Sequence, residues 1–358
     1  MKRKAGFFLT GIMVAGMLAP EVFAQTPAKK LFGSKPLPAA MKAQVHGFYT
    51  KGCVAGAIAI PVDGPNWQAM RLSRNRRWGH PELIATIESL SVKAKQDGWN
   101  GLLVGDISQP RGGPMLTGHR SHQIGLDADL WFNPMPDRRM SYNERENISA
   151  VSVLKKGSFY VDESRWTRAH TMLLYHAASF RNIERVLVHP GVKKKLCDTV
   201  KGDRSWLRKI RPTWGHHYHF HLRMACPSGS PDCRKQAATP SKTGCNDGSL
   251  DWWFKEGLVP KKPTGKKPKP RRELRVGDLP DACSAVLQAG APSIASATYR
   301  PVQAQGFVAP EIAIPEFSTA TVLKGRNIEA TGKSVANITG VETNGALSRV
   351  PVPTPRPR

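Results

Sequence analysis

Beyond residue 24 the sequence lacks any long apolar run, so we expect no membrane span in the rest of its 358 residues. The one such run, residues 6–19, follows a short basic stretch and precedes Val22-Phe23-Ala24 at the usual cleavage spacing. This order is typical of a secretory signal peptide over residues 1–24. An uncleaved anchor is the alternative, although the run is short for one. We therefore expect an exported protein that is soluble after cleavage.

Acidic residues are scarce: 27 Asp and Glu stand against 53 Lys and Arg, which gives a formal net charge of +26. Such an excess is typical of nucleic-acid-binding proteins, but no motif of that kind is present, and we expect no nucleic-acid partner. Outside the inner membrane the available anions are wall peptides with free carboxylates and acidic lipid surfaces. The simpler interpretation is a solvated surface and a basic tail.

No two of the six cysteines form a C-x-x-C pair, which argues against a thiolate metal site. An even number of cysteines in an exported chain predicts three disulfides instead. Many pairings are open, and distance along the chain suggests only that Cys226 and Cys233 close a small local loop. The other cysteines are Cys53, Cys197, Cys245 and Cys283.

Composition divides the chain into a signal, a folded domain and a tail. All tryptophans, cysteines and histidines lie between residues 25 and 285, which we predict to form one domain. Residues 260–272 are rich in Lys and Pro and form no regular element; a bridge from Cys283 to the core would make them a tethered loop. Residues 286–358 are rich in Ala, Pro, Ser, Thr and Val and are predicted to be a disordered tail.

The periodicity of apolar residues predicts two helices and several short strands. The helices cover residues 81–96 and 166–180. The strands cover residues 101–105, 125–132, 185–188 and 217–222. Long irregular stretches between them favour the α+β class, with a small antiparallel β-sheet flanked by helices and long loops.

Six of the eleven histidines gather in two short segments, and two aspartates lie beside the first. Alternate residues of a strand share a face, so neighbouring strands would bring these imidazoles and carboxylates together. Two His and one Asp with an open fourth position suit a catalytic zinc ion on the sheet. Surface or capping roles are the alternative. The clustered residues are His119, His122, Asp127 and Asp129, then His216, His217, His219 and His221.

Two smaller sets of residues are interpreted as non-catalytic. Ser121 lies between two of the clustered histidines, but no G-x-S-x-G nucleophile elbow surrounds it. The isolated histidines are expected to be structural or surface groups; they are His46, His80, His170, His176 and His189.

Longer stretches of the chain resemble one peptidase family. The spacing His122-x6-Asp129 followed by His219-x-His221 is similar to the ligand signature of the lysostaphin, D-Ala-D-Ala carboxypeptidase and Hedgehog-type metallopeptidase group. The stretches that resemble the penicillin-insensitive murein endopeptidases within this group are residues 111–114, 118–129, 206–212, 216–223 and 226–227. The resemblance covers about residues 45–285, and the chain after Cys283 has no counterpart in it.

The resemblance implies roles for the clustered residues. The implied Zn²⁺ ligands are His122, Asp129 and His221. The implied catalytic histidines are His219 as the general base, with His216 and His119 as further active-site groups that support the ligands or stabilise the tetrahedral intermediate. Asp127 competes with Asp129 as a ligand, but the spacing from His122 favours Asp129, and Asp127 would then orient an imidazole. The position of His217 need not be histidine.

The resemblance also implies a substrate, the D-alanyl–meso-diaminopimelyl cross-link between peptidoglycan stem peptides in the periplasm. A D-Ala-D-Ala carboxypeptidase and a non-catalytic wall-binding module with a structural metal are the alternatives, and a homodimer stays open. Arginines beside the motifs are candidates for pairing with substrate carboxylates, with solvated loop residues as the alternative; they are Arg111, Arg120 and Arg223. The family pattern further suggests the bridges Cys197–Cys245 and Cys53–Cys283.

Overall fold

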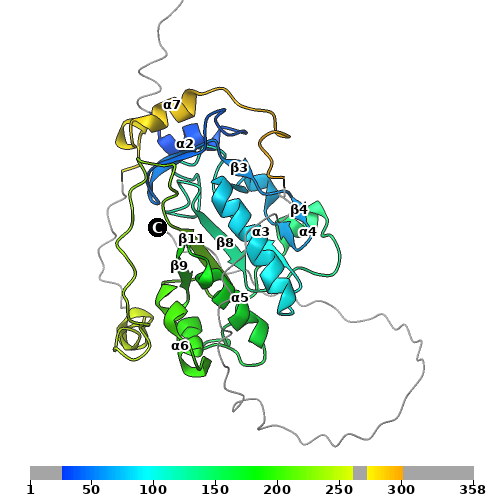
Figure 1. Ribbon diagram of the computed structural model, residues 1–358, viewed down its shortest axis with the longest axis vertical. Coiled ribbons are helices and arrows are strands. Elements are labelled where there is room, and N and C mark those ends of the chain that lie inside the picture. Colours follow the sequence, from blue (N-terminus) through cyan, green and yellow to red (C-terminus); the bar gives the residue numbers. More distant parts are fainter. Residues whose placement is uncertain (1–25, 261–271, 301–358) are drawn as a thin grey trace, which may run out of the picture.

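The computed structural model describes residues 26–260 and 272–300 (Figure 1). The predicted signal peptide, residues 261–271 of the Lys/Pro-rich stretch and residues 301–358 of the predicted tail lie outside the described residues. Within the described part of the chain, no helix is long and apolar enough to cross a membrane.

A seven-stranded mixed sheet forms the centre of the domain, in the order β10-β9-β11-β8-β7-β5-β4. The strands are β4 (Asp63–Gly64), β5 (Trp67–Ala69), β7 (Leu102–Val104), β8 (Asp127–Trp131), β9 (Ile183–Val188), β10 (Ile210–Pro212) and β11 (His219–Met224). The four predicted strands are all present, and their pairings with one another are antiparallel. The protein is thus a mixed α and β structure, as the sequence predicts.

The prediction of a small, purely antiparallel sheet is wrong at two pairs of strands. β10 lies parallel to β9, and β5 lies parallel to β7. Parallel neighbours need a crossover connection, usually a helix. Helix α6 (Pro190–Thr199) lies between β9 and β10 in the chain, and helix α3 (Pro81–Gln96) lies between β5 and β7. The sequence predicts α3 but not α6, and it does not show which strands the helices join.

Helix α3 has the predicted bounds, and α5 (Arg168–Ser179) is slightly shorter than predicted. The His80 imidazole accepts a hydrogen bond from the backbone N–H of Glu82, and Pro81 occupies the first turn, so α3 begins where the chain can cap it. Its apolar face is buried with α5 against the sheet (Figure 1). Packing of two amphipathic helices on one sheet face builds the main hydrophobic core.

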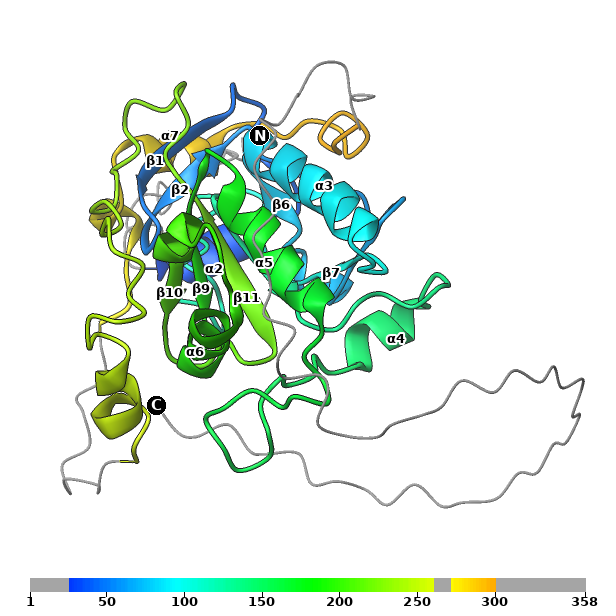
Figure 2. The same cartoon turned by 60° about the horizontal axis from the view of Figure 1, so that its bottom comes forward.

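The remaining elements surround this core (Figure 2). The other helices are α2 (Ala28–Gly33), α4 (Tyr142–Asn147) and α7 (Ala282–Gln288). The short helical turns are η1 (Leu72–Arg74), η2 (Ser205–Lys209), η3 (Trp253–Gly257) and η4 (Val276–Asp278). The two-stranded sheets pair β1 (Gln44–Phe48) with β2 (Lys51–Ala55) and β3 (Ile58–Ala59) with β6 (Trp78–Gly79).

Three disulfides are present, and they are the predicted set. They are Cys53–Cys283, Cys197–Cys245 and Cys226–Cys233. The first ties β2 to α7 within a second apolar cluster that also includes α2. The predicted domain boundary at residue 285 falls inside α7, where Val286 and Leu287 are buried. The backbone N–H of Tyr299 still bonds Ala59 O at 2.8 Å, so the chain packs on the domain beyond that boundary.

Candidate metal centre

The two sequence segments rich in histidine meet on adjacent strands. In the antiparallel pair of β8 and β11, His221 lies opposite Asp129. His219 lies opposite Trp131 one step along, and Arg223 lies opposite Asp127 in the other direction. Since alternate strand residues point to the same face, the register gathers all the polar side chains of this ladder on one face of the sheet.

Three side-chain atoms form a tight triangle at this place. His122 Nε2 lies 3.1 Å from His221 Nδ1 and 3.4 Å from Asp129 Oδ1, and His221 Nδ1 lies 3.2 Å from the same oxygen. A tetrahedral Zn²⁺ with nitrogen and oxygen ligands at about 2.0–2.1 Å holds those ligand atoms about 3.3 Å apart. The triangle therefore has the size of one face of a zinc coordination tetrahedron.

The hydrogen-bond partners of both imidazoles turn lone pairs into this triangle. His122 Nδ1 lies 2.7 Å from Ile107 O, and His221 Nε2 lies 2.8 Å from Asp127 Oδ1. Each of these nitrogens donates to its oxygen, which assigns the lone pairs to His122 Nε2 and His221 Nδ1. Asp129 Oδ1 is buried and has no hydrogen-bond partner among the described residues. Three lone-pair atoms that face one another without a hydrogen between them are suited to be the ligands of a cation.

In the absence of a metal ion, His122 keeps a proton at neutral pH. Burial lowers the pKa of His122, but the charge of the Asp129 carboxylate outweighs burial and raises that pKa to about 9. The triangle thus attracts positive charge, whether a proton or a metal ion supplies it.

Asp127, the competing ligand candidate, has all its acceptor capacity engaged. It accepts from the backbone N–H of His122 at 2.9 Å, from His221 Nε2 and from Arg223 Nε at 2.7 Å. Burial opposes its charge, but Arg223 and His221 outweigh burial and hold the pKa of this carboxyl well below its usual range. Asp127 therefore orients the His221 imidazole and the His122 backbone, and Asp129 is the carboxylate that keeps acceptor capacity for an ion.

His219 and His216 lie beside the triangle. His219 Nε2 is 3.5 Å from Asp129 Oδ1, and the rings of His216 and His219 are 4.8 Å apart. Burial lowers the pKa of each imidazole to about 4, so both are neutral at pH 7. His216 has φ of +55°, and His122 has φ of +65°. Left-handed backbone is uncommon for histidine, and here it occurs at two residues of one site.

His119 approaches the centre from the other side of Asp129. Its Nδ1 lies 3.5 Å from Asp129 Oδ2, and its Nε2 lies 3.0 Å from Asp106 Oδ2. His119, His122 and Asp129 also form a set whose ligand atoms lie within 4.8 Å of one another. Asp106 is buried, but its bond to His119 and the charges of Arg74 and Arg76 outweigh burial and lower its pKa to about 2. Asp106 thus orients His119 as Asp127 orients His221.

The other histidines have structural partners, as the sequence predicts for the five isolated ones. They are His46 (paired with Asp232), His80 and His189 (caps of α3 and α6), His170 (bonded to Phe132 O), His176 (paired with Asp97) and His217 (bonded to Ser152). His217 precedes β11 and points away from the triangle, although the sequence places it on a predicted strand.

Two of the three arginines proposed to contact substrate have structural roles instead. Arg111 is buried and donates to the carbonyls of Val286 and Leu287 at the end of α7, at 2.8 and 2.9 Å. Arg223 is buried against Asp127. Arg120 is exposed.

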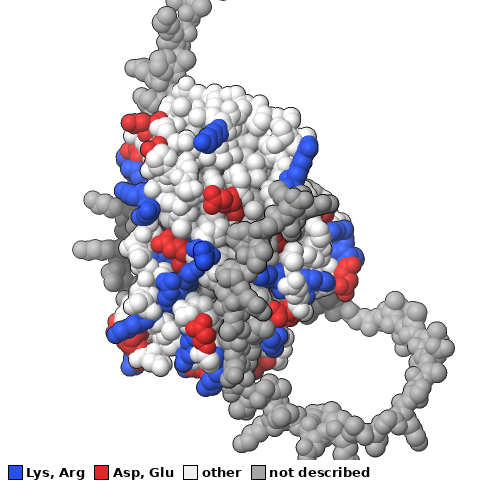
Figure 3. Space-filling view, in the orientation of Figure 1, with Lys and Arg blue, Asp and Glu red and all other residues white. Residues whose placement is uncertain are grey.

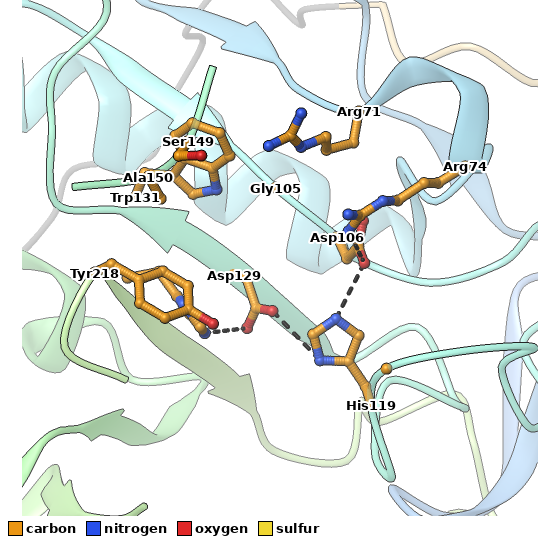
Figure 4. Close-up of a pocket in the computed structure, with 12 residues that line it drawn as sticks. Arg71, Arg74, Gly105, Asp106, His119, Asp129, Trp131, Ser149, Ala150 and Tyr218 are labelled. Atoms are coloured by element: carbon orange, nitrogen blue, oxygen red, sulfur yellow. Dashed lines mark hydrogen bonds and ion pairs between the residues drawn. The ribbon is translucent and has the colours of Figure 1, made fainter. Parts of the chain in front are cut away.

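A cavity of about 420 Å³ opens directly beside the metal centre (Figure 4). From the centre itself, its lining includes His119, Asp129 and His219. The other polar and aromatic groups in its wall were not among the residues that the sequence predicts for the site; they include Arg71, Arg74, Asp106, Trp131 and Tyr218. Asp106 follows a predicted strand directly, which is a usable signal, whereas the arginines come from a turn without any motif.

Surface charge gives no sign of a polyanion-binding face on the side shown in Figure 3. Lys and Arg side chains there are interspersed with Asp and Glu and do not form one continuous basic patch. On this face, charge alone therefore does not favour a nucleic-acid or lipid surface as partner.

Comparison with known proteins agrees with the site. The profile of the penicillin-insensitive murein endopeptidases matches residues 45–288. The penicillin-insensitive murein endopeptidase of Haemophilus influenzae is 41% identical over 239 residues, which are 66% of this chain and 83% of that protein. Its namesake from Salmonella paratyphi B is 35% identical over 275 residues, 77% of this chain and 96% of that protein. The chain belongs to the penicillin-insensitive murein endopeptidase family.

Proposed function

We propose that this protein is a zinc-dependent murein endopeptidase that hydrolyses the D-alanyl–meso-diaminopimelyl cross-link between peptidoglycan stem peptides. The relatives named above are murein endopeptidases, and one of them aligns over 96% of its own length. The observation that carries the zinc assignment is the buried Asp129 Oδ1, which faces lone pairs of His122 and His221 at 3.4 and 3.2 Å.

The ligands we assign to Zn²⁺ are His122, Asp129 and His221. When bound there, the ion makes a water molecule more acidic and polarises the scissile carbonyl. His219 is neutral at pH 7 and lines the cavity, so we assign it as the base that takes the proton from the attacking water. The same imidazole then returns a proton to the leaving amine. No serine nucleophile takes part.

His119 and His216 are assigned as the further active-site histidines. Asp106 fixes the His119 ring beside Asp129, where a proton on that ring would favour negative charge developing on the carbonyl oxygen. The His216 Nδ1–H donates to Trp214 O at 2.7 Å, which holds the ring against His219. We infer that His216 keeps the base in its working orientation.

The periplasm is the location we infer for this activity. Three disulfides suit an oxidising compartment, and murein lies outside the cytoplasm. A signal peptide at residues 1–24, a basic loop within residues 260–272, a tail toward residue 358 and a homodimer remain predictions.

The test is digestion of purified cross-linked muropeptide dimers, followed by mass spectrometry. We expect conversion of dimers to monomers, loss of conversion after chelation, and recovery on adding stoichiometric Zn²⁺. Release of terminal D-alanine without loss of the cross-link would instead identify a carboxypeptidase. Binding of dimers with no product at all would identify a non-catalytic module.

A further inference from the structure

One cation in the wall of the cavity, Arg71, is attracted by the acidic groups of Glu146 and Asp106 but bonds neither of them. The Arg71 guanidinium donates from Nη2 to Ile148 O at 2.8 Å and lies 5.8 Å from the centre of the Trp131 ring. It forms no ion pair with any described residue, whereas Arg74 beside it pairs with Asp106 at 3.1 Å. Four of the five N–H donors of Arg71 are therefore left for another acceptor.

The backbone holds Arg71 in place firmly. Its φ is +55°, and Asn75 on the far side of η1 has φ of +51°. Glu146 fixes the turn between them by accepting from the backbone N–H and the hydroxyl of Ser73, at 2.8 and 2.7 Å. The backbone N–H of Arg71 bonds Arg145 O at 3.2 Å. Left-handed backbone at a non-glycine residue persists only where surrounding contacts impose it, and it is typical of residues that bind ligands.

Arg71 and the metal centre share the same cavity. Figure 4 shows the Arg71 side chain extending toward Trp131 on one side, with Asp129 and His119 on the other. A cavity of about 420 Å³ holds only the few residues around the scissile bond. A group that reaches Arg71 must therefore lie close to that bond along the substrate.

The cross-link carries such a group. In a D-alanyl–diaminopimelyl bond, the carbon that holds the leaving nitrogen also holds a free carboxylate. An arginine beside the metal would pair with this carboxylate through two parallel hydrogen bonds. Partial burial and the charge of Arg74 lower the pKa of Arg71 by more than Glu146 and Asp106 raise it, and an anion bound there would offset the net effect.

We propose that Arg71 binds the carboxylate next to the leaving amine and so selects substrates in which that carboxylate is free. The proposal rests on the proposed function, because it takes the substrate from it. Arg74 adds positive charge to the cavity while it stays bonded to Asp106. The Trp131 ring lies 5.8 Å from the Arg71 guanidinium. Arg71 is thus a substrate-binding residue on the side of the leaving group.

The experiment compares two muropeptide dimers that differ only at this carboxylate, free in one and amidated in the other. The wild-type protein should cleave the free acid with kcat/KM about 10- to 100-fold higher, the range expected for a hydrogen bond to a charged group. Arg71→Gln should remove most of this preference by slowing cleavage of the free acid alone. Arg71→Gly should do the same, since glycine adopts the left-handed backbone without strain.

Arg181→Ala is the matched control, because it also removes one exposed arginine. Arg181 lies just before β9, whose first residue Ile183 pairs with Met224. Met224 is the last residue of β11, whereas His219 is the first, so Arg181 lies at the end of the sheet away from the cavity. This variant should keep both the activity and the preference. Equal cleavage of the two dimers by the wild type, or an unchanged preference in both Arg71 variants, would overturn the assignment of Arg71. Failure of the wild type to cleave either dimer would count against the proposed function instead.

Discussion

Two cross-strand pairs of the ladder between β8 and β11 place their aspartates in different surroundings. At one end, Asp127 and Arg223 form a closed pair, with the Arg223 guanidinium 4.2 Å from the centre of the Tyr49 ring. At the central pair, Asp129 lies opposite His221 among imidazoles that donate nothing to its Oδ1, and a cavity opens beside it. The two aspartates are two residues apart on one strand and are both buried.

The difference between the two aspartates is one of hydrogen-bond donors rather than of burial. Asp127 meets donors on every side and therefore fixes the geometry of His122 and His221. Asp129 meets lone pairs, so positive charge stabilises it, whether a proton on His122 or a metal ion supplies that charge. A carboxylate with a full set of donors supports its neighbours, whereas one without donors binds an ion. Substitutions of the two aspartates and of their neighbours should therefore have different effects on zinc binding and on stability.

Asp129→Ala should abolish both zinc binding and turnover. At neutral pH the substitution also removes the charge that stabilises the His122 proton, so the metal-free variant should melt lower than the metal-free wild type there, and no lower above pH 9, where that proton is lost. Metal analysis, muropeptide digestion and calorimetric melting test the three parts. A variant that keeps stoichiometric zinc would contradict the assignment of Asp129 as a ligand.

His219→Ala should reduce kcat by about 10²–10⁴ while zinc stays bound, because the proposed role of this imidazole is proton transfer. Metal content and the rate of dimer cleavage are measured on the same preparation. Loss of the metal from this variant would show that His219 is the ligand, and the assignment of base and ligand between His219 and His221 would be wrong.

Asp127→Asn should weaken zinc binding by about 10- to 100-fold without removing it, as is usual when the group that orients a metal ligand is changed. It should also destabilise the fold by about 3–5 kcal/mol, since the buried Arg223 loses its charge partner. Zinc titration and denaturant unfolding measure the two effects. An intact fold with all zinc lost would make Asp127 the ligand.

Zinc affinity should rise with pH by about tenfold per unit and become constant above about pH 9. The Asp129 carboxylate outweighs burial and raises the pKa of His122 to about 9 in the metal-free protein, and zinc binds only the unprotonated nitrogen. The same proton stabilises the metal-free fold below the ordinary histidine pKa, and this stabilisation is lost as pH rises through 9. Calorimetric titrations from pH 6 to 9 test the slope, and a pH-independent affinity would show that His122 carries no such proton.

The sequence predicts those parts of the centre that depend on short-range geometry. The spacing of Asp127 and Asp129, and of His219 and His221, fixes a common strand face whatever the rest of the fold does. The register between β8 and β11 depends on the whole fold. The buried carboxylates on one strand and the imidazoles on the other nevertheless restrict it to a few possibilities.

Groups that depend on distant segments were not predictable in the same way. Arg71, directly before η1, and Arg74, at its end, reach the cavity from a turn between β5 and β6 that no motif marks. Arg111 adjoins a motif and looks available for substrate, yet the carbonyls that occupy it come from the end of α7. The parallel pairing of β10 with β9 likewise follows from the path of α6 rather than from strand sequence.

Zinc X-ray absorption on the purified protein tests the central claim most directly. Two imidazole nitrogens and one carboxylate oxygen at about 2.0–2.1 Å are expected, with no sulfur in the first shell. The spectrum should lose this set of ligands in the Asp129→Ala variant and keep it in the His219→Ala variant. A zinc–sulfur distance of about 2.3 Å, or a spectrum unchanged by Asp129→Ala, would contradict the assignment of the triangle of His122, Asp129 and His221 as the metal centre.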